Sequence, residues 1–204
     1  MLNLITKYIH LTRKRIYPEL MMSKNAKEMV AIEVNRLFED VLRCLQVHKS
    51  SISLCQLHNC MIDVFPEKTN SRIRKFIKER LVIDMHTNDT NVMDMNLKHI
   101  KAHVSKKNSK CSIGKDVQIA LACIIIYLCE ETLDFIGKKV KQDGKVLITP
   151  KYVYIVFKTD MDHLFDHITL NTLKRYCKDK ALLHDTLDCV KKYSLKHLKY
   201  LKQH

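Results

Sequence analysis

The sequence predicts an all-α protein. Glycine and proline number only three each in 204 residues, too few for the tight turns of sandwiches, barrels and Rossmann folds. Apolar residues make up 46% of the chain, enough for a buried core. Lysine and arginine total 36 against 22 acidic residues, a net charge of +14, which indicates a polyanionic partner: nucleic acid first, an acidic membrane surface second.

The first half of the chain predicts a short, a long and a short helix, followed by a basic one. Residues 7–17 form a short basic amphipathic stretch that a proline ends. After Ser23, a residue suited to an N-cap, apolar side chains recur at helical spacing from 24 to about 47. A polar break precedes a short helix over 54–65, and the strongly basic segment 67–82 predicts a further helix.

The same order recurs in the second half. The polar stretch 84–94 is typical of a linker. A short basic helix is predicted over 97–107, a long one over 116–142, and a short one from Pro150, a residue favoured at the first helical position. Residues 164–204 combine leucines at helical spacing with many lysines, and they predict a helical tail.

A single short–long–short unit cannot cover the apolar stripe of its own central helix, which at about 25 residues would be about 37 Å long. Two units packed head to tail, with the long helices crossing, would bury both stripes. Such packing places the first break of each unit beside the second break of the other. Backbone N–H groups at helix starts, together with lysines, would then form a row of phosphate-binding groups.

Residues in the first half resemble a 2B-type core histone. Tyr17-Pro18 resembles that family's His-Pro corner, and Ser23-Lys24 resembles the start of its central helix. VNRLFED at 34–40 is similar to its V-N-D-I-F-E-R segment, and HKSSIS at 48–53 to its K-R-S-T-I-T loop. PEKTNSRIRKFIKERL at 66–81 stands where the family has an extra C-terminal helix.

The second half resembles a 2A-type core histone. The segment 120–164 is similar to that family's central helix, second loop and third helix, including an I-x-P-(Arg/Lys) corner at 148–151. The resemblance covers roughly residues 7–165 and implies a covalent doublet of the kind associated with large DNA viruses. Leu147 stands where the family has an arginine, and His48-Lys49 where it has a basic pair, so arginine insertion into the minor groove should be weakened.

The resemblance implies four parts. Residues 1–83 would be a 2B-type histone fold with an extra C-terminal helix, 84–95 a linker, 96–165 a 2A-type histone fold, and 166–204 a lysine-rich helical extension. The two folds would pair as a pseudo-heterodimer. The doublet would bind double-stranded DNA largely independently of sequence and package it into nucleosome-like particles. Its expected partner is a second doublet or a pair of the other two core histone types.

The candidate DNA-binding residues are basic and hydroxyl side chains at breaks and helix ends, where contact with phosphate is favourable. A solvated basic face is the alternative interpretation of scattered lysines. The candidates are Arg13, Lys14, Arg15, Lys24, Lys49, Ser50, Ser51, Lys106, Lys107, Lys110, Ser112, Lys115, Lys145, Thr149 and Lys151.

A group of acidic residues stands where the 2A family has its docking patch. It implies a surface for an arginine-bearing peptide, and a solvated acidic face is the alternative. The group comprises Glu130, Glu131, Asp134, Asp160 and Asp162.

Several functional classes are not expected. The chain has no P-loop, G-x-G-x-x-G or G-x-S-x-G motif, which argues against an enzyme, and no cofactor is expected. Cys55, His58 and Cys60 would converge poorly on a helix, so no zinc site is expected. The longest strongly apolar run, 119–129, is about half of what a bilayer span needs.

Two other functions remain open: a histone-fold transcription factor, and a non-histone viral DNA-binding or scaffold protein. The expected location is the nucleus and its chromatin. If the source is a virus, the virion and the host nucleus or viral factory are expected instead.

Overall fold

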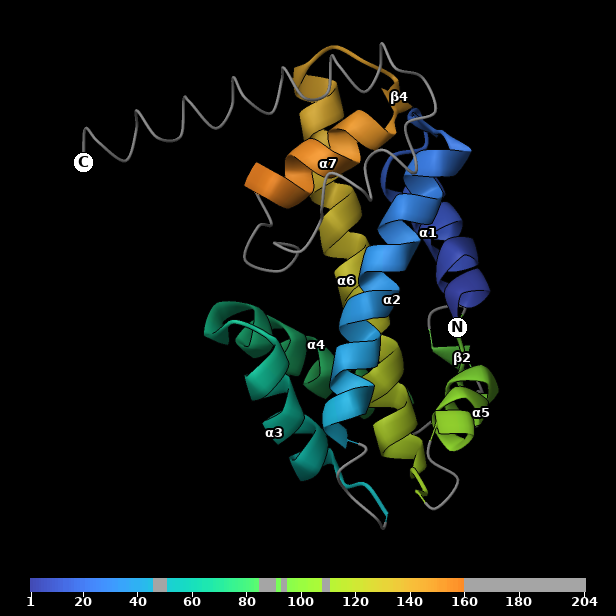
Figure 1. The fold of residues 1–204 in the computed structure, drawn as a ribbon, viewed down its shortest axis with the longest axis vertical. Helices are drawn as coiled ribbons and strands as arrows, with labels where there is room; N and C mark the ends of the chain where they lie inside the picture. Colours follow the sequence, from blue (N-terminus) through green and yellow to red (C-terminus); the bar gives the residue numbers. More distant parts are fainter. Residues whose placement is uncertain (46–50, 85–90, 93–94, 108–110, 160–204) are drawn as a thin grey trace, which may run out of the picture. The chain divides into compact units, whose positions relative to one another are not determined.

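The computed structural model describes residues 1–45, 51–84, 91–92, 95–107 and 111–159 (Figure 1). The described part of the chain is mostly helical, as predicted. Its helices are α1 (Leu2–Ile16), α2 (Lys24–Leu45), α3 (Leu54–Val64), α4 (Glu67–Asp84), α5 (Leu97–Lys107), α6 (Lys115–Gln142) and α7 (Pro150–Thr159). Its strands are β1 (Met21–Met22), β2 (Asn91–Val92), β3 (Met95–Asn96) and β4 (Leu147–Ile148).

Two details differ from the sequence prediction. Helix α1 begins at Leu2 rather than near residue 7. Its buried residues Ile5, Tyr8, Ile9 and Thr12 form one face at helical spacing, and this face extends into the segment that the prediction left out. A short antiparallel pairing between β2 and β3 begins within the predicted linker and ends at Asn96, just beyond it.

The chain forms two compact units, and neither coincides with a half of the sequence. Unit 1 comprises Met1–Thr12 and Ala31–Glu131, and unit 2 comprises Arg13–Val30 with the described residues from Thr132 onward. Each unit therefore combines segments from both halves, and α1, α2 and α6 contribute residues to both units. The four-part division by resemblance stays a prediction, and its extension at 166–204 lies outside the described residues.

The core of unit 1 is built around the first part of α6. Every residue from Ile119 to Ile126 is fully buried, so this segment is enclosed on all sides. Partners from the first half meet the next turn of α6: the Tyr8 hydroxyl donates to Glu130 over 3.2 Å, and Arg72 pairs with Glu131 at 3.1 Å. The core of unit 1 therefore requires both halves of the chain.

In unit 2, Tyr17 connects the end of α1 to α6. Its hydroxyl donates to the Asp134 carboxylate over 2.9 Å, and the Lys141 Nζ lies 4.7 Å from its ring centre. A Cβ at Gly137 would collide with the Tyr17 ring, so only glycine fits there without displacement. Tyr17 thus fixes the loop between α1 and α2 to α6, the long helix of the second half.

The pKa of Tyr17 is raised to about 12, mainly by burial. The hydrogen bond to Asp134 and the negative charge of that carboxylate raise it further. An unfolded tyrosine titrates near 10. Between these values the folded chain holds more protons than the unfolded chain, so the free energy of unfolding should fall as pH rises from about 10 to about 12.

The variant Tyr17→Phe tests this assignment. Its free energy of unfolding, measured with urea across this pH range, should fall less than that of the native protein. Some fall should remain, because burial also raises the pKa of Tyr127 and Tyr154. Identical pH profiles for the two proteins would contradict the Tyr17 assignment.

Candidate nucleic-acid interface

In unit 2, a loop of the first half is hydrogen-bonded to a loop of the second half. Strands β1 and β4 pair in parallel, with Met21 opposite Leu147. The Met21 N–H donates to the Val146 carbonyl over 2.7 Å, and the Ser23 N–H donates to the Ile148 carbonyl over 3.0 Å. The first break of the first half therefore lies beside the second break of the second half, as the sequence pattern predicts.

Two helices begin directly beyond this pairing (Figure 1). Ser23 precedes α2, and its hydroxyl accepts from the Ala26 N–H over 3.2 Å. Thr149 precedes α7, and its carbonyl accepts from the Tyr152 N–H over 3.1 Å. Because the paired strands hold the two starts together, the positive ends of two helix dipoles face one locality, which favours an anion.

The predicted basic residues of unit 2 differ in exposure and in their contacts. Lys14, Arg15, Lys24 and Lys145 are exposed, while Lys151 is half-buried in the first turn of α7. The Arg13 guanidinium instead donates to the Leu20 carbonyl over 2.5 Å. Arg13 therefore holds the loop before β1 in place, whereas Lys14, Lys24 and Lys145 present their side chains to solvent, with the Lys24 Nζ 4.0 Å from the Glu28 carboxylate.

Unit 1 repeats the arrangement with the other two breaks. Ile52 forms a parallel bridge with Ile113, and the Ile52 N–H donates to the Ser112 carbonyl over 3.0 Å. Helix α3 begins beyond this bridge behind a capping box made by Ser53 and Gln56. Helix α6 begins there at Lys115. The predicted residues Ser51, Ser112 and Lys115 are all exposed at this second pairing.

Lys106 and Lys107, in the last turn of α5, differ in their surroundings. Lys106 is exposed, whereas the Lys107 Nζ lies 3.0 Å from the Glu39 carboxylate. The His103 Nε2 lies 2.7 Å from the other oxygen of that carboxylate. Although burial acts in the opposite direction, these two hydrogen bonds leave the pKa of Glu39 below its ordinary value. Lys107 is thus already engaged by a carboxylate inside unit 1.

A basic groove between α1 and α5 was missed by the sequence prediction. Its cavity measures about 510 Å³, and its titratable lining residues are Lys7, His99, His103 and Lys106. The α5 members recur at intervals of four and three, so they share one helix face. That periodicity was the available signal for the α5 members, whereas nothing in the sequence pattern indicated that Lys7 of α1 lines the same groove.

The three described acidic candidates already have partners within their own units. Glu130 accepts from Tyr8. Glu131 pairs with Arg72, and its side chain is 16% exposed. Asp134 accepts from Tyr17 and pairs with Lys138 at 2.6 Å. An arginine-bearing peptide would have to displace these partners, so the docking patch stays a prediction.

Some predicted residues lie outside the described part of the chain: Lys49, Ser50, Lys110, Asp160 and Asp162. Among the described residues, no group of three or more His, Cys, Asp or Glu side chains could hold a metal ion. No described helix combines the length and apolar character needed to cross a membrane.

Comparison with known proteins found no relative. No protein-family model matches the chain, and no curated protein is significantly similar to it.

Proposed function

We propose that this chain is a doublet of histone-type folds that binds duplex DNA through its phosphates and packages it into nucleosome-like particles. The observation that carries the proposal is the repeated loop pairing. In unit 2, β1 of the first half pairs in parallel with β4 of the second, and in unit 1, Ile52 pairs in parallel with Ile113. Two helices begin beyond each pairing, so each unit offers one phosphate-binding locality.

The chemistry of these localities suits backbone phosphate. Helix-start N–H groups, hydroxyls and lysines contact phosphate oxygens, which occur at every nucleotide and carry no sequence information. Binding should therefore be largely independent of sequence and steeply dependent on salt. Fusion of the halves makes their pairing intramolecular, which raises effective concentration and fixes a one-to-one ratio. The proposed partner in the particle is a second doublet or a pair of the other two core histone types.

Nuclease digestion of reconstituted complexes tests this function. Mixed-sequence DNA is assembled with the full chain, alone and with a pair of the other two core histone types, and then digested. The expected result is a long protected fragment of no preferred sequence; for comparison, a complete histone octamer wraps about 147 base pairs. A short footprint at one preferred sequence would indicate a transcription factor. Absence of affinity for DNA at low salt would indicate a scaffold and would overturn the proposal.

A further inference from the structure

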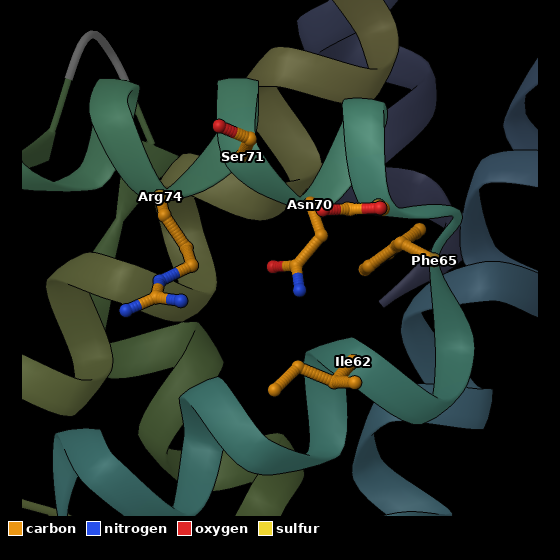
Figure 2. Close-up of a pocket in the computed structure, with 6 residues that line it drawn as sticks. Ile62, Phe65, Asn70, Ser71 and Arg74 are labelled. Atoms are coloured by element: carbon orange, nitrogen blue, oxygen red, sulfur yellow. The ribbon is translucent and has the colours of Figure 1, made fainter.

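A groove lies between α3 and α4 in unit 1, and none of its lining residues belongs to a loop pairing. Its first hollow has a volume of about 550 Å³ (Figure 2) and is lined by Ile62, Phe65, Glu67, Asn70, Ser71 and Arg74. A second hollow of about 440 Å³ is lined by His58, Arg74, Lys75, Lys78, Leu81 and Val82, among others. The two hollows share Arg74, and residues of both α3 and α4 line each of them, so they are named together as the α3–α4 groove.

The α4 residues of this groove follow one helix face. Positions 67, 70, 74, 78 and 81 recur at intervals of three and four. Between the first and last of them, α4 rises about 21 Å. The groove is therefore long enough for a short peptide segment.

Asn70 supplies an unsatisfied polar group inside the first hollow. The residue is 6% exposed, and its side-chain oxygen has no hydrogen-bond partner among the described residues. Figure 2 shows its amide pointing from α4 into the space between the two helices. Buried amide oxygens are nearly always paired, so this one favours a ligand that brings an N–H donor.

The charge along the groove is predominantly positive. Arg74, Lys75 and Lys78 are exposed, and none forms an ion pair with another described residue. Glu67, at the first turn of α4, contributes one carboxylate to the lining. Three cations against one anion favour an acidic ligand, and Arg74 lines both hollows.

Apolar side chains distinguish this groove from a DNA-binding surface. Ile62 is 58% exposed and Val82 is 64% exposed, so both present apolar area to solvent. Protein–DNA interfaces are polar and strongly charged, and phosphate gains nothing from such area. A protein ligand, unlike phosphate, carries apolar side chains that could cover Ile62 in the first hollow and Val82 in the second.

We propose that the α3–α4 groove binds an acidic, apolar peptide segment of a partner protein. Its carboxylates would pair with Arg74, Lys75 and Lys78, and its apolar side chains would cover Ile62 and Val82. After a side-chain rotation that brings the buried Asn70 amide oxygen to the groove, a peptide N–H would donate to it. This role is independent of DNA binding and can hold whether or not the chain packages DNA.

The test measures how tightly a fluorescein-labelled peptide binds to the full-length protein. In this peptide, Asp and Glu alternate with Leu and Phe. A matched peptide with Lys and Arg in place of the acids controls for apolar adhesion. The combined variant Arg74→Glu, Lys75→Glu and Lys78→Glu should bind the acidic peptide about tenfold more weakly or worse. Reversing Lys24, Lys145 and Lys151 changes the net charge equally and should leave peptide binding nearly unchanged.

Two further measurements separate the groove from general attraction to a basic protein. Ile62→Ser should weaken binding, whereas Val146→Ser should not, although both native side chains are 58% exposed. The side-chain amide resonance of Asn70 should shift when the peptide is added. Equal loss in the two charge-reversal variants, equal binding of both peptides, or no binding at all would overturn the proposal. A loss of DNA affinity instead of peptide affinity in the α4 variant would assign the groove to nucleic acid.

Discussion

Reversing the charge of Lys24, Lys145 and Lys151 together is expected to weaken DNA binding roughly a hundredfold and to reduce the salt slope by about three. Lys24 and Lys151 lie in the first turns of the helices that begin beyond the β1–β4 pairing, and Lys145 precedes β4. Each substitution by glutamate would remove one contact with phosphate, and with it the counterion release that this contact causes. It would also place a negative charge next to phosphate. Anisotropy titrations of a labelled mixed-sequence duplex at several salt concentrations give both quantities.

The matched control is the α4 variant Arg74→Glu, Lys75→Glu and Lys78→Glu. It lowers the net charge by the same amount but lies outside both loop pairings. It should retain most of the DNA affinity and most of the salt slope, apart from a weak long-range effect. If the two variants lose affinity equally, the total charge of the protein governs binding, and the loop pairings have no special role.

Local signals were sufficient to predict most of the helices. Pro18 and Pro66 separate helices because proline lacks an N–H and restricts the residue before it. Ser23 and Ser53 cap α2 and α3 as their residue type favours. The repeat also predicted which breaks would meet, because two amphipathic units can cover each other in few ways.

Local signals could not predict how individual side chains are used. Lys107 pairs with Glu39, and Tyr17 donates to Asp134, across separations in sequence that no periodicity encodes. The guanidinium of Arg13, a predicted DNA-binding residue, hydrogen-bonds to the Leu20 carbonyl. Such outcomes depend on which groups the folded chain brings within reach. The pairing of the loops therefore could be predicted, but the contacts of single residues within them could not.

Cleaving the folded chain within the predicted linker, at a protease site inserted after Asn88, is expected to leave the two fragments associated. They should elute together on gel filtration at micromolar concentration. Each compact unit contains segments from both sides of the cut, so separation would expose both cores. The fully buried stretch Ile119–Ile126 would lose the first-half residues that share unit 1 with it.

The fragments expressed separately provide the control. Residues 1–88 alone and 89–204 alone should each lose most of their helical circular dichroism and their cooperative unfolding, because amphipathic helices gain most of their stability from packing. Mixing the two should restore both signals. If either fragment folds alone, or if the cleaved protein separates into folded halves, the halves are independent domains. The loop pairings would then be contacts between finished folds rather than parts of shared cores, and the proposal of a mutually dependent pair would fail.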